Sequence, residues 1–107
     1  MIRDSKFGNM PTRIDGRLFH SRKEARRYQE LKTMQAAGLI SDLECQPVFD
    51  LSVGGVHICR YVGDFQFIDL ERGGVIVVED VKGWRTEVYR LKAKLMKAVH
   101  GIEVQEI

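Results

Sequence analysis

The sequence lacks any apolar run long enough to cross a bilayer, and its N-terminus lacks the apolar core of a secretory signal peptide. We therefore expect no membrane partner and a cytoplasmic location. The only two cysteines, Cys45 and Cys59, lack the spacing of metal-binding pairs. This argues against a zinc site and favours free thiols over a disulfide. Internal repeats and low-complexity segments are also missing from the 107 residues, so one domain is expected.

An excess of charge of one sign is missing too. The chain has 17 Lys and Arg against 15 Asp and Glu, a formal net charge of +2, which permits nucleic-acid binding without arguing for it. Hydrophobic residues make up 44% and charged residues 30%, as in an ordinary globular protein. The positions of the charged residues are therefore more informative than their number.

The first third of the chain predicts an arm, a hairpin and a helix. Residues 1–12 combine turn-forming residues with no apolar periodicity, so we expect a flexible N-terminal arm before a domain over 13–107. An Asp-Gly pair between short extended pieces predicts a hairpin over 13–19. Residues 21–24 form a capping box that opens a helix to about Ala37.

Glu24, in the first turn of this helix, has two possible roles. It lies near the centre of the helix's apolar stripe, so its carboxylate is aimed toward the core. It either completes the capping box or belongs to a polar site, and the periodicity does not separate the two. The stripe itself consists of Ala25, Tyr28, Leu31 and Met34.

The middle of the chain predicts strands. Extended patterns cover residues 40–51, 56–62 and 64–68, and Pro47 indicates an edge or an irregularity in the first of them. The β-branched run that begins at Val75 is typical of a strand covered on both faces.

A second helix is predicted to begin near Thr86, followed by a last strand over 102–107. The element order is helix, antiparallel strands, helix, strand, which predicts a mixed α/β protein with helices around a central sheet. The apolar stripe of the second helix is predicted to be Val88, Leu91, Leu95 and Val99.

The strand that begins at Val75 ends in charged residues. Side chains alternate along a strand, so Asp80 and Lys82 project from one face and Glu79 from the other, where we expect it to pair with a helix arginine. A local ion pair beside a turn is one interpretation of Asp80 and Lys82. A binding site is the other, because charge at the tip of a buried strand is costly without compensation.

Two further carboxylates are predicted to lie near Asp80. Asp64 begins the preceding strand, and Glu24 can approach from the packed helix. A cluster of carboxylates beside a lysine offers the oxygen ligands that a hard divalent cation requires, with substrate phosphate completing its coordination.

These residues resemble the PD-(D/E)XK nuclease superfamily, and more narrowly a group of small phage and prophage proteins described as Holliday-junction-resolvase-like. The similarity covers residues 13–107 and rests on SRKEARRY at 21–28, DLE at 42–44, QP at 46–47, YVGDF at 61–65 and VEDVKG at 78–83. One departure is Gly63, which stands where the superfamily has a nominal proline before its aspartate.

The resemblance implies a restriction-endonuclease-like fold, with a central mixed sheet flanked by helices. It implies Mg²⁺-dependent hydrolysis of DNA phosphodiester bonds, with Mn²⁺ as a substitute and branched or structured DNA as substrate. The metal ligands would be Glu24, Asp64, Asp80 and the backbone carbonyl of Val81, and Lys82 would be catalytic.

Several other residues are candidate DNA contacts, each with a plainer alternative. Basic side chains on the surface serve as phosphate contacts or as solvated faces. An aromatic side chain after the active strand stacks on a base or packs at the rim of the core. Scattered histidines without partner spacing are more often surface residues than ligands. The candidate DNA contacts are Arg13, Lys23, Arg27, Trp84, Arg85 and Lys92, and the histidines set aside are His20, His57 and His100.

Two alternatives to an enzyme remain open from the sequence. One is a nucleic-acid-binding module that has lost catalysis, and the other is a phage structural or partner-binding protein on the same fold. Because one short chain offers one active centre, we expect a two-fold homodimer if two strands are cut, whereas a nickase can be a monomer.

Overall fold

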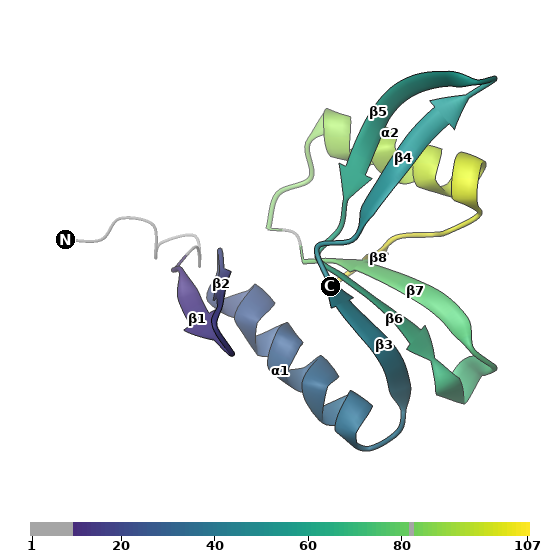
Figure 1. Cartoon of the computed structure of the whole chain (residues 1–107). Helices are drawn as coiled ribbons and strands as arrows, with labels where there is room; N and C mark the ends of the chain where they lie inside the picture. The colour runs from purple at the N-terminus through teal and green to yellow at the C-terminus, as the bar shows by residue number, and fades with distance from the viewer. Residues whose placement is uncertain (1–9, 82) are drawn as a thin grey trace.

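The computed structural model describes residues 10–81 and 83–107 (Figure 1). Most of the predicted arm, 1–12, lies outside these residues, as does Lys82. The first strand already begins at Thr12. The elements are β1 (Thr12–Ile14), β2 (Arg17–Phe19), α1 (Arg22–Ala36), β3 (Ile40–Cys45), β4 (Val48–Val53), β5 (Val56–Val62), β6 (Phe65–Asp69), a 3₁₀ turn (Leu70–Arg72), β7 (Val75–Asp80), α2 (Glu87–Leu95), a π-helical turn (Met96–His100) and β8 (Gln105–Glu106).

The predicted mixed α/β class is confirmed by a four-stranded sheet of order β3-β6-β7-β8. The β3–β6 and β6–β7 pairs are antiparallel, and β7–β8 is parallel. A parallel pair needs a crossover connection, and here α2 lies within it. The ends of β6 and β7 that carry Phe65 and Glu79 are therefore directly adjacent.

The other four strands form two hairpins outside this sheet. The β1–β2 turn at Asp15 and Gly16 was predicted, and both residues have the positive φ, 52° and 76°, that a tight hairpin of this kind requires. The predicted irregularity at Pro47 is confirmed as well. Gln46 has φ 56° and Pro47 has no N–H to donate, so the chain leaves the sheet there and returns only at β6.

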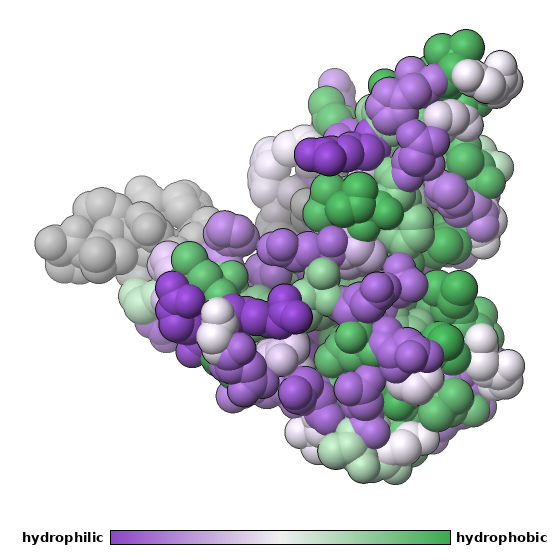
Figure 2. Space-filling view, viewed as in Figure 1, coloured by the Kyte–Doolittle hydropathy of each residue, from purple (hydrophilic) through white to green (hydrophobic). Residues whose placement is uncertain are grey.

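Hydrophobic clusters lie on the two faces of the sheet. On one face, α1 and β2 pack against Phe65, Phe67 and Val77. On the other, α2 and the β4–β5 hairpin pack against Val78. In the view of Figure 2, hydrophilic side chains cover α1, while apolar patches lie over the β4–β5 hairpin. Successive residues of β7 thus belong to different cores.

The prediction that β7 is covered on both faces is right for its second half only. Val77 and Val78 are buried, but Val75 and Ile76 are each 49% exposed. The last strand is also shorter than predicted, since β8 spans Gln105–Glu106 and pairs only with the end of β7. The first half of β7 therefore lacks a strand on its outer side within the described residues.

The first helix agrees with the prediction. The Ser21 side chain accepts a hydrogen bond from the Glu24 backbone N–H at 3.1 Å, and Gly38 follows the C-cap with φ 79°. Ala25, Tyr28 and Leu31 are buried, as the stripe predicted.

The predicted stripe of α2 is wrong for its first two members, because Val88 is 62% exposed and Leu91 is 58% exposed. The buried side chains are Tyr89 and Met96. Tyr89 faces the sheet because its hydroxyl donates a hydrogen bond to Glu106 in β8, and the π-helical turn from Met96 shifts the buried face away from a regular 3.6-residue period. No helix in the described ranges is long and apolar enough to span a membrane.

Candidate active site

Asp80 is the last residue of β7 and is 2% exposed. One of its carboxylate oxygens, Oδ2, accepts a hydrogen bond of 2.5 Å from the hydroxyl of Tyr61 in β5. Burial and this hydrogen bond raise the pKa of Tyr61, so its hydroxyl keeps its proton at neutral pH and acts as a donor. A buried carboxylate is therefore held by a fixed donor at the end of the central strand.

Asp64 lies beside Asp80, just before β6. Its backbone N–H donates to the Glu79 carbonyl at 3.0 Å, and its Oδ2 accepts from the Val81 N–H at 2.6 Å. Burial raises the pKa of Asp64 to about 7, opposed by the Val81 hydrogen bond and reinforced by the negative charges of Asp80 and Glu24. Two carboxyl groups thus meet where the sequence predicted, at the ends of neighbouring strands.

Glu24 joins this pair from α1. Its side chain is buried, 7% exposed, although it lies in the first turn of a helix. Burial raises the pKa of Glu24 and the charge of Asp80 adds to the shift, while contacts with His20 and a hydrogen bond with Asp64 oppose it. The Ser21 side chain caps the helix by accepting from the Glu24 backbone N–H, while the Glu24 carboxyl group is hydrogen-bonded both to the backbone of His20 before the helix and to Asp64 in the acidic cluster. We call Glu24, Asp64 and Asp80 the carboxylate cluster.

Glu79 points to the opposite face of the sheet, as predicted. Its two carboxylate oxygens accept from Arg27 Nε at 2.8 Å and Nη2 at 2.6 Å, a bidentate pair in which the Glu79 side chain is 4% exposed. Arg27 also pairs with Glu30 at 3.0 Å. Glu79 is therefore not part of the carboxylate cluster. Its partner Arg27 is one of the residues that the sequence predicted as DNA contacts.

The other basic candidates fall into two groups. Arg85 is tied to Glu106 through its Nε at 2.5 Å, and Lys92 is partly covered on α2. Arg13 and Lys23 are exposed on β1 and α1, and Arg13 donates to the backbone of its own hairpin at 3.3 Å. Trp84, at 80% exposure, is on the surface rather than in the core.

Two residues at the cluster had no signal in the sequence. Tyr61 reads as an ordinary inward-facing strand residue, because its partner Asp80 is 19 positions away. His20 had been set aside with the other histidines, yet its backbone is hydrogen-bonded to the Glu24 side chain. The remaining histidines have other partners, with His57 Nδ1 at 2.6 Å from Asp50 Oδ1 and His100 Nε2 at 2.7 Å from the Asp50 carbonyl.

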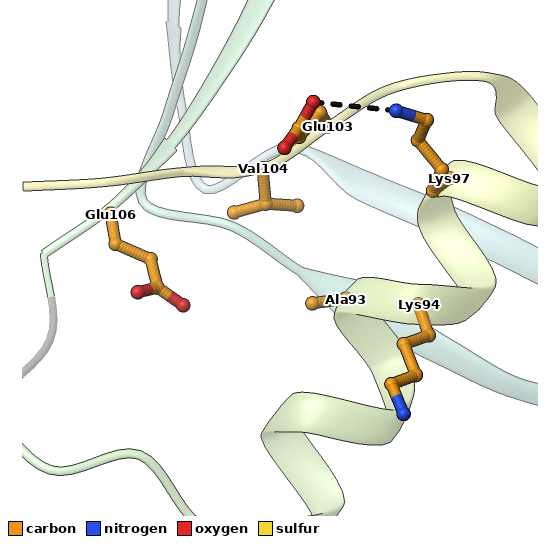
Figure 3. A pocket seen from close by; sticks show the side chains of 6 residues that line it. All are labelled: Ala93, Lys94, Lys97, Glu103, Val104 and Glu106. Atoms are coloured by element: carbon orange, nitrogen blue, oxygen red, sulfur yellow. Dashed lines mark hydrogen bonds and ion pairs between the residues drawn. The ribbon is translucent and has the colours of Figure 1, made fainter.

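An open groove of about 440 Å³ lies between α2 and the last strand (Figure 3). Lys97 pairs with Glu103 across it at 3.3 Å, and Glu106 points into it while bonded to Arg85 and Tyr89. Its charges are therefore largely matched internally, which makes it a weaker candidate for chemistry than the carboxylate cluster. The residues that line it are Ala93, Lys94, Lys97, Glu103, Val104 and Glu106.

The donor set of the carboxylate cluster fits a hard cation such as Mg²⁺. The three carboxyl groups supply only oxygen, and burial disfavours the charged forms of Glu24 and Asp64 unless positive charge is added. In the ranges that the structure describes, no three His, Cys, Asp or Glu side chains are already arranged as a ligand group. Val81 contributes its N–H to the cluster, and its carbonyl as a ligand stays a prediction. Cys45 and Cys59 are free and half-buried.

The fold and the cluster define a mixed α/β protein with buried acidic residues at the end of its sheet. A family model described as "Protein of unknown function (DUF1064)" matches residues 4–105, so the chain belongs to this family. Comparisons with curated proteins and with solved structures gave no match. The description of the family names no activity.

Proposed function

We propose that the protein is a Mg²⁺-dependent DNA endonuclease with a restriction-endonuclease-like fold, acting on branched or structured DNA. The observation that supports it most is that the buried Glu24 and Asp80 meet the half-buried Asp64, since three acidic groups that repel one another at a sheet end need a reason to be there. The succession of α1, three antiparallel strands, α2 and a parallel strand fits the same assignment.

The chain's own residues would hold the cation and the substrate. Asp64 and Asp80 are fixed by the backbone of Val81 and by Tyr61, and Glu24 reaches the cluster from α1. When bound, the cation supplies positive charge to the phosphate oxygens and acidifies the attacking water. Lys82 is expected to orient that water or to stabilise charge on the phosphate.

Exposed basic and aromatic residues would position the DNA. Arg13, Lys23, Trp84 and Arg85 are the exposed members of the predicted set, although Arg85 is also paired with Glu106. Phosphate contacts by such basic side chains fix register without reading sequence. Arg27 is a weaker candidate for this role, because its guanidinium is paired with Glu79 and Glu30.

The test is to incubate the purified protein with plasmid and with synthetic four-way junctions, in Mg²⁺, in Mn²⁺ and in chelator. We expect strand cleavage with either metal and none in chelator, and loss of cleavage in Asp80→Asn. A protein that binds these DNAs but never cuts them would be a nucleic-acid-binding module instead. A protein that neither binds nor cuts them would fit the structural or partner-binding alternative.

A further inference from the structure

The β4–β5 hairpin reaches the carboxylate cluster through one residue. Tyr61 is 3% exposed, and its ring packs against Phe49 at a centroid distance of 6.4 Å and lies in the cluster of Val78 on the α2 face. Its hydroxyl meets Asp80 Oδ2 at 2.5 Å, so both ends of the side chain are constrained. The packing of the hairpin therefore fixes the position of the Tyr61 hydroxyl relative to Asp80.

Gly63 makes room for this arrangement. A Cβ at this position would lie 3.2 Å from Val78 Cγ1 and 3.3 Å from Tyr61 Cε2, closer than such atoms normally approach. The Gly63 N–H also donates to the Pro47 carbonyl at 3.0 Å, which closes the base of the hairpin. The absence of a side chain beside Asp64 thus allows the tyrosine ring to lie against the central strand.

We propose that Tyr61 is a positioning residue that orients the Asp80 carboxylate for a divalent cation. This inference rests on the proposed function. A carboxylate that ligates a metal is usually held by a hydrogen-bond donor behind it, and removing such a donor typically weakens metal binding about 10- to 100-fold. The role assigned to the hairpin is to supply that donor, in addition to its packing on α2.

The test compares Tyr61→Phe with Tyr28→Phe. Each variant removes one hydroxyl from a buried tyrosine bonded to a carboxylate, but the Tyr28 hydroxyl donates to Asp15 at 2.9 Å in the β1–β2 turn. Calorimetric titration with Mg²⁺ and with Mn²⁺ should show affinity about 10- to 100-fold weaker in Tyr61→Phe and unchanged in Tyr28→Phe. In cleavage assays, the Mg²⁺ concentration for half-maximal rate should rise in Tyr61→Phe while the KM for DNA stays the same.

The outcomes separate this inference from the proposed function. Metal binding of wild-type strength in Tyr61→Phe would overturn the role of Tyr61 and leave the nuclease proposal standing. Equal weakening in both tyrosine variants would overturn it too, because the effect would then be general destabilisation. Absence of metal binding by the wild-type protein would overturn both.

A measurement on the wild-type protein covers the case in which Tyr61→Phe does not fold. The chain has three tyrosines, so ring-¹³C tyrosine labelling gives three signals, assigned with Tyr28→Phe and Tyr89→Phe. Addition of Mg²⁺ should shift the Cζ resonance of Tyr61, whose hydroxyl is bonded to Asp80, and leave that of Tyr28 in place. A Tyr61 resonance that does not move at saturating Mg²⁺ would contradict the inference.

Discussion

At the scale of single residues, a substitution at Glu24 tests whether this buried acid in the first turn of a helix is a metal ligand. Glutamine keeps its shape and removes the charge that burial disfavours there, so Glu24→Gln should melt within about one or two degrees of wild type. A neutral amide is a far poorer ligand for Mg²⁺. Cleavage should therefore fall on the order of a hundredfold, about 2.7 kcal/mol of transition-state stabilisation.

The matched control for Glu24 is Glu87→Gln, which alters the exposed acid in the first turn of α2. It should change neither cleavage nor its Mg²⁺ dependence. If Glu24→Gln also cuts DNA at the wild-type rate under limiting Mg²⁺, Glu24 has only a structural role.

Asp64 makes the stability of the metal-free protein depend on pH. Its pKa is raised from 3.8 to about 7 on folding, so the folded state binds a proton that the unfolded state releases between these values. The stabilisation that this bound proton provides is fully present below pH 3.8 and is lost as the pH rises through about 7. The raised pKa of Glu24 acts in the same direction.

Asp64→Asn isolates this effect, because an amide accepts from Val81 and donates to Asp80 without a charge. In chelator the variant should be more stable than wild type near pH 8, and the difference should shrink as the pH falls to about 5. Denaturant unfolding of both proteins across this range measures it. A difference that does not change with pH would contradict the assignment.

The residue scale also shows where sequence reasoning stops. The alternation of side chains separated Asp80 from Glu79 and predicted an arginine partner for Glu79, because strand geometry is local. The contact between Tyr61 and Asp80 was not predictable, since it depends on where a hairpin from outside the sheet packs.

At the scale of elements, Arg27 fastens α1 to β7. Arg27→Met leaves the buried Glu79 carboxylate unpaired, which typically costs about 3–5 kcal/mol of unfolding free energy. Lys23, one turn earlier on α1, is exposed and should contribute nothing comparable. Urea unfolding of the two variants compares these costs.

The same two variants should separate stability from DNA contact. Lys23→Met is expected to lower the slope of log affinity against log salt by about one, as for one lost phosphate contact. Arg27→Met should leave that slope unchanged, because its guanidinium is already paired. A lower slope for Arg27→Met would instead identify Arg27 as a DNA contact.

The two helices differ in how well their sequences predicted them. In α1, a capping residue and four apolar positions at regular spacing agree with the packing. In α2, the apolar period pointed to Val88 and Leu91, but a tyrosine with a hydrogen-bond partner in β8 and a π-helical turn decided the buried face. Tertiary contacts of this kind override a short periodic pattern.

At the scale of the whole molecule, the next prediction concerns the oligomeric state. We expect a two-fold homodimer, at least on a four-way junction, because one chain brings one carboxylate cluster and two strands must be cut. Light scattering of the protein alone and with a junction measures this. A monomer in both states would remove the paired-cut mechanism and leave a nickase.

The order of elements along the chain was predictable, whereas their arrangement in space was only partly so. The predicted order of strand, helix and strand at the end of the chain agrees with the structure, in which β7 and β8 form a parallel pair across α2. The departure of β4 and β5 from the sheet was not predicted, because it follows from the backbone at Gln46 and from packing on α2.

The most direct test of the carboxylate cluster is the melting temperature of wild type and Asp80→Asn, each in chelator and in saturating Mg²⁺. In chelator, removing one buried charge should make Asp80→Asn the more stable protein. Mg²⁺ should raise the melting temperature of the wild type, since a ligand of the native state stabilises it, and leave the variant nearly unchanged. If Mg²⁺ and Mn²⁺ shift neither protein, or shift both equally, the cluster is not a metal site and the proposed function falls with it.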